Sequence, residues 1–178
     1  MYTYDRLFSE YNHTVAQLLV TGDYVQDEAR RRNFHNTLYR LLELGALPVI
    51  NENDTIATDE IVIGDNDTLS AIVASTVEAD LLILLSDIDG LYTADPRCDA
   101  GARLIPVVEA ITPEIEALAG GNGTSLGTGG MVTKLRAARI AGEAGIDMVI
   151  ANGARPELLY DIIDGKPVGT RFIGREKA

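Results

Sequence analysis

Cysteine is almost absent from this sequence of 178 residues, which contains only Cys98. A single cysteine excludes a disulfide framework within the chain and a zinc site built from cysteines, and it suits a reducing cytoplasm. Long apolar runs are also absent, since none approaches the roughly 20 residues that cross a bilayer. Residues 1–15 lack a basic segment followed by an apolar one, so we expect a cytoplasmic protein that is neither exported nor inserted.

Basic side chains are scarce as well. The sequence contains 15 Lys and Arg residues and 27 Asp and Glu residues, which gives a formal net charge of -12. Such a charge repels nucleic acid and anionic membranes at long range, so neither is expected as a partner. It does not exclude a nucleotide, because a bound divalent cation and a few backbone amides can reverse the potential locally.

Strands and helices alternate along the rest of the chain. Hydrophobic residues make up 46% of it, and one domain of this length buries roughly 70% of its unfolded surface. Apolar spacing predicts a helix that starts at residue 4 and runs into a strand at 15–20. Further helices are predicted at 33–44, 68–79, 112–119, 132–144 and 156–163. Further strands are predicted at 46–50, 81–85 and 148–151. The prediction is an α/β fold, a three-layer α/β/α sandwich with a mainly parallel central sheet.

Ligands of such sheets bind beyond the carboxyl ends of the strands. The loops after Ile50, Leu85 and Ala151 should therefore share one edge, and tertiary folding has to bring residues 120–130 there. These segments are where we look for functional side chains.

Residues 51–67, NENDTIATDEIVIGDND, follow a predicted buried strand and precede a predicted helix. Asp54 and the amides of Asn51 and Asn66 could hold the ammonium and carboxylate of an amino acid, because amides both donate and accept hydrogen bonds. Asp67 is expected to cap the helix beginning at Thr68, and it could also orient lysines around a phosphate.

The same segment has other interpretations. Residues 65–67 alone could form turns and caps, which Asx residues do commonly. An oxygen-rich cluster also suits magnesium or calcium, although we assign no protein metal ligands. The apolar run at 61–63 could be a hairpin strand that brings the two polar clusters together.

The stretch LLILLSDIDGLYTADP places Asp87 and Asp89 directly after a predicted strand. It resembles the Asp-x-Asp-Gly motif of haloacid dehalogenase-like hydrolases, in which Asp87 would be the nucleophile and Asp89 the general acid. That alternative needs a downstream lysine and acidic pair, and it leaves residues 51–67 without a role.

Residues 120–134 are glycine-rich and lead into a helix, with Lys134 one turn inside it. Backbone N–H groups in such a loop can approach phosphates, while the helix N terminus and the lysine supply positive potential. The spacing matches neither the Gly-Lys-Ser/Thr phosphate loop nor the dinucleotide signature. A mobile surface loop is the alternative.

Four motifs occur in order: INENDTIATDEI, GDNDTLSA, ADLLILLSDIDGLYTADPR and GTGGMVTKLRAA. Together with the closing PVGTRF, they resemble the glutamate 5-kinases of the amino acid kinase superfamily almost from end to end. The resemblance implies transfer of the ATP γ-phosphate to the side-chain carboxylate of L-glutamate, the first step toward proline. It also implies magnesium carried mainly by the nucleotide, a homo-oligomer, and proline as an inhibitor.

The resemblance also assigns roles to individual residues. Asp54 and Asn66 fall on glutamate-binding positions, with Asn51 beside them, and Asp67 and Lys134 fall on catalytic positions. Lys134 should stabilise charge on the transferring phosphoryl group, and Asp67 should organise the catalytic lysines. The nucleotide-binding positions are Ser86, Asp87, Thr128, Gly129, Gly130, Met131, Val132, Thr133 and Lys134.

A glutamate side chain has a pKa of about 4.3 and is already ionised at neutral pH, so the implied reaction needs no general base. His13 and His35 therefore need no catalytic role, and we expect them at the surface or partly packed. Catalysis would consist of in-line positioning and electrostatic compensation.

The chain also departs from the family it resembles. Members begin with a strand, a Gly-Ser-rich turn and a lysine that binds the phosphates, and many end with an RNA-binding-like PUA domain. We expect residues 1–178 to be a partial amino acid kinase domain without these parts, and hence of low activity. The alternatives are a non-catalytic remnant that binds glutamate or proline, and kinases of N-acetylglutamate, aspartate or UMP, whose polar loops differ.

Overall fold

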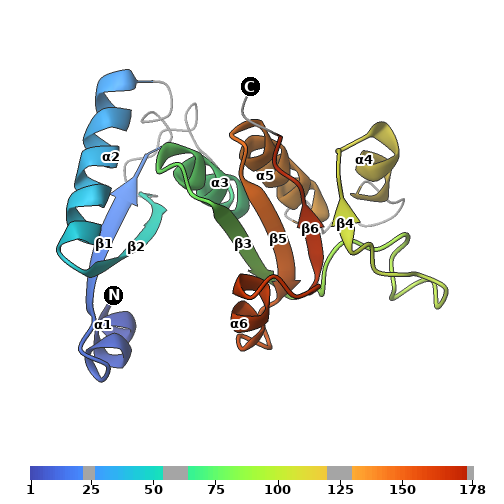
Figure 1. Ribbon diagram of the computed structural model, residues 1–178, viewed down its shortest axis with the longest axis horizontal. Helices are drawn as coiled ribbons and strands as arrows, with labels where there is room; N and C mark the ends of the chain where they lie inside the picture. The colour runs from blue at the N-terminus through green and yellow to red at the C-terminus, as the bar shows by residue number, and fades with distance from the viewer. Residues whose placement is uncertain (22–26, 54–63, 120–129, 176–178) are drawn as a thin grey trace. The chain divides into compact units, whose positions relative to one another are not determined.

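The computed structural model describes residues 1–21, 27–53, 64–119 and 130–175 (Figure 1). The chain divides into two compact units, Met1–Leu69 and Ser70–Ala178. The division falls within a helix, α3 (Asn66–Thr76). Among the helices in these described ranges, none is both long and apolar enough to cross a membrane.

The first unit is built on a pair of parallel strands. In chain order it contains α1 (Tyr2–Ser9), β1 (Thr14–Val20), α2 (Glu28–Glu43) and β2 (Ala46–Glu52). The pairing runs from Thr14 opposite Ala46 to Val20 opposite Glu52. The predicted helix leading into a strand at the start of the chain is confirmed, and so is the strand beginning at Ala46.

Helix α2 begins earlier than its apolar pattern predicted. Asp27 is its N-cap, and the Asp27 carboxylate accepts hydrogen bonds from the backbone N–H groups two and three residues on, at 2.8 and 3.1 Å. The first turn is charged, so apolar spacing alone missed it. Phe34 and Leu38, four residues apart on one face of the helix, are buried. The helix is followed by Gly45, whose φ of 71° is a conformation that glycine adopts without strain.

The second unit contains a four-stranded sheet with the order β3-β5-β6-β4. Its elements are β3 (Leu81–Ser86), β4 (Val107–Val108), α4 (Pro113–Ala119), α5 (Met131–Glu143), β5 (Asp147–Asn152), α6 (Leu158–Ile163) and β6 (Thr170–Phe172). Strands β3 and β5 are parallel, as are β4 and β6, whereas β5 and β6 are antiparallel. The sequence prediction missed β4 and β6, which are short.

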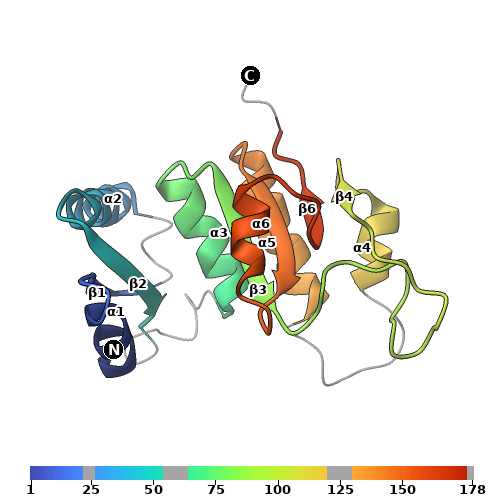
Figure 2. The ribbon, with the colours of Figure 1, turned by 60° about the horizontal axis from the view of Figure 1, so that its bottom comes forward.

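The second unit has the predicted three layers. Alternate residues of β3 and β5 face opposite sides of the sheet, as the period of two requires. One face packs against α3 and α5, which lie side by side (Figures 1 and 2), and the other packs against α6. The first core includes Ala71, Ala74, Leu82, Leu84, Leu135, Ala138, Met148 and Ile150, and the second includes Ile83, Val149, Ala151 and Ile162.

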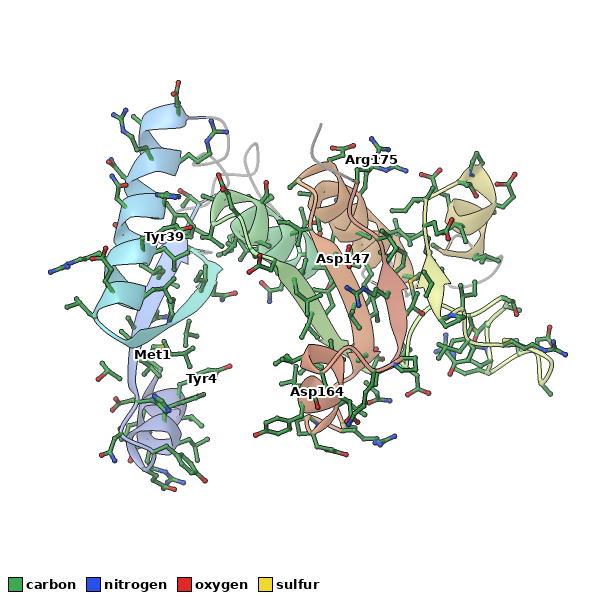
Figure 3. All side chains as sticks on the ribbon, in the orientation of Figure 1. Met1, Tyr4, Tyr39, Asp147, Asp164 and Arg175 are labelled. Atoms are coloured by element: carbon green, nitrogen blue, oxygen red, sulfur yellow. The ribbon has the colours of Figure 1, made fainter. Side chains whose placement is uncertain are left out.

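An ion pair fastens β6 to the start of β5. Asp147, labelled in Figure 3, accepts hydrogen bonds from Nε of Arg171 at 2.8 Å and from the backbone N–H of Gly174 at 2.7 Å. Asp147 is the first residue of β5, so this contact lies at the amino end of the strand, away from its carboxyl end.

Thr170 joins β6 to two other segments from a fully buried position, with 0% of its surface exposed. Its hydroxyl donates to the carbonyl oxygen of Ile105 at 2.6 Å and accepts from the N–H of Leu91 at 2.8 Å. A Thr170→Val variant keeps the shape but leaves both buried partners unsatisfied. We expect the free energy of unfolding to fall by about 2–4 kcal/mol in urea denaturation. Thr170→Ser, which keeps the hydroxyl, should cost about 1 kcal/mol, and equal stabilities of the valine variant and the unaltered protein would contradict this account.

Candidate functional site

The carboxyl ends of β3 and β5 meet at one edge of the second unit's sheet. Ser86, the last residue of β3, is paired in register with Asn152, the last residue of β5. The prediction that the loops after Leu85 and Ala151 share an edge is therefore confirmed. The strand that carries Ile50 belongs to the other sheet, in the first unit.

Ser86 and Asp87 stand at this edge. Ser86 is half-buried and Asp87 is exposed. The Ser86 hydroxyl donates to Oδ1 of Asp87 at 3.0 Å, and the Ser86 carbonyl oxygen accepts from the N–H of Gly153 at 2.7 Å. The backbone is thus held by the neighbouring strand, while a hydroxyl and a carboxylate face solvent beyond the sheet. Such a pair can bind hydroxyl groups or the hydration shell of a cation.

Asp89 lies two residues further on and bonds across to the end of β5. Its Oδ1 accepts from Nδ2 of Asn152 at 2.8 Å, and its Oδ2 accepts from the Tyr92 hydroxyl at 3.0 Å. Asn152 in turn accepts at Oδ1 from the N–H of Ala154 at 2.9 Å. The hydrogen bond from Asn152, and then that from Tyr92, lowers the pKa of Asp89. Sequence reasoning missed Asn152 and Tyr92, although the place of Asn152 just after a predicted strand was an available signal.

This arrangement opposes the phosphatase alternative. A general acid has to carry a proton at neutral pH, whereas both carboxylate oxygens of Asp89 accept hydrogen bonds and its pKa is lowered. Asp89 is therefore held as an acceptor. The motif that resembled a phosphatase motif serves here to connect two strand ends.

The N terminus of α5 lies at the same edge. A short turn joins α5 to β5, and the two pack together side by side, so the helix starts where the strand ends (Figure 1). Its N-cap, Gly130, has no side chain with which to bond the first-turn N–H groups, and an anion suits such a terminus. Lys134, one turn inside, is 9% exposed. Thr128 and Gly129, which were predicted to continue this segment, lie outside the described residues.

Val132 and Thr133 complete the predicted nucleotide segment. Val132 is exposed, whereas Thr133 is buried and its hydroxyl donates to the carbonyl oxygen of Gly130 at 2.9 Å. Met131, the first residue of the helix, packs against the core of the second unit. The first turn of α5 therefore packs against the core through Met131 and is exposed to solvent at Val132.

In the first unit, two of the predicted glutamate-binding residues, Asn51 and Asn66, flank residues 54–63. Strand β2 runs two residues past the predicted Ile50, so exposed Asn51 lies inside it. Buried Glu52 accepts at Oε2 from the N–H of Gly64 at 3.3 Å, which draws the two flanks together. Asn66 is exposed at the start of α3. Asp54 lies outside the described residues, as does the run at 61–63.

The expectation that Asp67 caps a helix starting at Thr68 is wrong. Helix α3 begins at Asn66, and the cap is Asp65, whose carboxylate accepts from the N–H of Thr68 at 2.6 Å and from its hydroxyl at 2.9 Å. The cap has to precede the helix in order to reach the N–H three residues on. Asp67 lies in the first turn of α3, where its negative charge interacts favourably with the helix dipole.

His35 is half-buried and packs against Tyr39 on α2, with ring centroids 4.3 Å apart. His13 is exposed. The expectation that each histidine lies at the surface or is partly packed is confirmed.

A mainly parallel α/β sheet with polar strand ends, next to a helix N terminus suited to anions, is typical of proteins that bind nucleotides. The family model of the amino acid kinase family matches residues 1–152. The chain therefore belongs to the amino acid kinase family. Solved kinases share its fold at low identity. An isopentenyl phosphate kinase of T. acidophilum aligns with a TM-score of 0.63 at 18% identity, covering 94% of this chain and 63% of its own. A carbamate kinase from Giardia lamblia aligns with a TM-score of 0.64 at 17% identity, covering 95% and 65%.

Within this family the chain is a homologue of glutamate 5-kinases. It is 51% identical to the glutamate 5-kinase of Clostridium perfringens over 180 residues, which cover 99% of this chain and 67% of the relative. It is 55% identical to that of Deinococcus radiodurans over 173 residues, covering 97% and 48%. The chain thus spans about half to two thirds of the length of these relatives.

Proposed function

We propose that this chain transfers the γ-phosphate of ATP to the side-chain carboxylate of L-glutamate, in proline biosynthesis. The observation that carries the proposal is its 51% identity to a glutamate 5-kinase along 99% of its length. The geometry supports it, because Ser86, Asp87 and the N terminus of α5 occupy one edge of the second unit's sheet.

The second unit supplies the nucleotide-binding groups in this proposal. Ser86 and Asp87 contact the nucleotide, and the segment from Thr128 to Thr133 surrounds its phosphates with backbone N–H groups. Lys134 compensates the charge that develops on the transferring phosphoryl group. A carbamate kinase with the same fold is described as bound to AMP-PNP.

Magnesium is proposed to arrive with the nucleotide, where it neutralises phosphate charge. The Ser86 hydroxyl and the exposed Asp87 carboxylate are oxygen groups of the kind that suits its hydration shell. Within the described residues, His, Cys, Asp and Glu form no group of three or more able to hold a metal ion.

The first unit supplies the groups proposed to bind glutamate. Asn51 and Asn66 are exposed polar side chains on the two flanks that Glu52 connects, and Asp54 is assigned to the same role. Asp67 is proposed to organise the catalytic lysines. Because the glutamate carboxylate is already ionised, the protein has to align it with the phosphate and offset charge, and no proton needs to be removed.

Further properties follow from the family resemblance and stay proposals. Residues 1–178 are proposed to be part of an amino acid kinase domain in the cytoplasm, where a chain with one cysteine is suited to the reducing conditions. A homo-oligomer and inhibition by proline are proposed in the same way.

The test measures ADP release from Mg-ATP by the purified chain, with hydroxylamine present to trap an acyl phosphate as the hydroxamate. We expect hydroxamate only when L-glutamate is added, and none with L-aspartate or D-glutamate. Calorimetry on the same sample measures the binding of ATP and of L-glutamate. Binding of both without hydroxamate would favour the ligand-binding remnant, and turnover independent of glutamate would overturn the proposal.

A further inference from the structure

The segment from Ser86 to Leu91 is held at both ends. Ser86 ends β3 and accepts from the N–H of Gly153 at 2.7 Å. Gly90 is buried, and a Cβ there would lie 2.5 Å from Oγ1 of Thr170. Leu91 is 1% exposed, and its N–H donates to the same hydroxyl at 2.8 Å. The stretch between these anchors, residues 87–89, contains Asp87.

Within that stretch Asp89 has one contact with a distant strand. Its carboxylate accepts from Nδ2 of Asn152 at 2.8 Å, across the edge from β3 to β5. A second bond, from the Tyr92 hydroxyl at 3.0 Å, occupies the other oxygen. Asn152 is oriented in turn, because its Oδ1 accepts from the N–H of Ala154 at 2.9 Å. These three bonds therefore fix the orientation of the Asp89 carboxylate and of the Asn152 amide.

Stability alone does not account for these bonds. Asp89 is exposed, and exposed polar contacts contribute little to folding because water competes for both partners. A carboxylate also adds negative charge beside an edge proposed to bind phosphates, which is unfavourable there. The bonds from Asn152 and Tyr92, and the nearby positive charge of Arg155, offset that charge and lower the pKa of Asp89. The remaining effect is geometric, because the bonds fix the backbone on which Asp87 is placed.

We propose that Asp89 and Asn152 are positioning residues for the nucleotide, which hold Asp87 and the ends of β3 and β5 in the arrangement that binds ATP. The inference rests on the proposed function and adds to it a pair of residues that act through Asp87. The hydrogen-bond directions make it testable, because the donor and acceptor of the pair can be exchanged.

The experiment compares Asn152→Asp, Asp89→Asn and the double exchange, using calorimetry with Mg-ATP and separately with L-glutamate. Asn152→Asp sets two carboxylates against each other, and we expect the Kd for Mg-ATP to rise about tenfold. Asp89→Asn loses one acceptor and should raise it about threefold to tenfold. In the double exchange the introduced amide donates to the introduced carboxylate, which still accepts from the N–H of Ala154. Its Kd should return to within about threefold of the unaltered protein.

The Kd for L-glutamate and the melting temperature serve as controls that separate the outcomes. The Kd for L-glutamate should not change in any variant, whereas a general loss of folding would weaken both ligands and lower the melting temperature. If the unaltered chain binds ATP and Asn152→Asp binds it equally well, the inference is wrong and the proposed function stands. If the unaltered chain binds no ATP, the proposed function fails and the inference falls with it. Should Asn152→Asp not fold, Asp89→Asn and the double exchange decide, and a double variant as weak as Asp89→Asn overturns the pairing.

Discussion

Replacing Lys134 with methionine should lower glutamate-dependent turnover by about a thousandfold or more. Lys134 is 9% exposed one turn inside α5, at the edge where the phosphates are proposed to bind. A charge in a poorly hydrated site acts more strongly on a developing phosphoryl charge than the same charge in water. Methionine keeps the apolar stem and fills the space, so the variant removes the charge with little loss of packing.

The matched control is Arg136→Ala, which removes a positive charge from an exposed position on the same helix. It should keep turnover within about threefold, since an exposed charge is screened by water. Calorimetry should find the Kd for L-glutamate unchanged in the Lys134→Met variant. Ordinary hydroxamate formation by that variant would show that Lys134 is not catalytic, and an equal loss in Arg136→Ala would show that only net charge matters.

Gly169→Ala should destabilise the protein far more than Gly165→Ala. Both glycines have positive φ, 64° for Gly169 and 76° for Gly165. At Gly165 an added Cβ meets nothing within 4 Å, so only backbone strain of about 1 kcal/mol is expected. At Gly169 the Cβ would collide with the carbonyl oxygen of Ile150 and lie 3.0 Å from that of Asp89. Backbone atoms of β5 cannot move aside easily, so we expect a loss of about 3 kcal/mol or more.

Urea denaturation of the two variants beside the unaltered protein gives the comparison. Because each substitution adds the same methyl group at a similar φ, the difference between them isolates the contact with β5. Equal losses would show that β6 shifts without cost. A larger loss at Gly169 would confirm that the end of β5 and the loop containing Asp89 are closely packed.

The elements found from the sequence are those with a strong local pattern. The apolar run at 81–85 and the helical spacing at 132–144 both predicted their elements within a residue or two. Strands β4 and β6 were missed because two or three residues carry no usable period, and their pairing comes from residues far along the chain. The start of α2 was missed because a cap and a charged turn define it.

The candidate site shows the same division. Ser86 and Asp87 could be placed at a strand end, because a buried strand followed by polar residues is visible in the sequence. Asn152 could not be paired with Asp89, which lies 63 residues away, until the register of β3 and β5 was known. The assignment of Asp67 as a cap failed for a local reason, since Asp65, Asn66 and Asp67 all suit a helix start and the sequence does not say which residue precedes the first turn.

Composition and local order along this chain were enough to identify the α/β class, the segments that carry polar groups, and a resemblance to kinases of glutamate. Those properties depend on periods and motifs of neighbouring residues. The partners of Asp89, the burial of Lys134 and the two bonds of Thr170 depend instead on which strands pair and in which register. Such contacts form between residues distant in sequence, and their energies come from groups that only the folded chain brings within bonding distance.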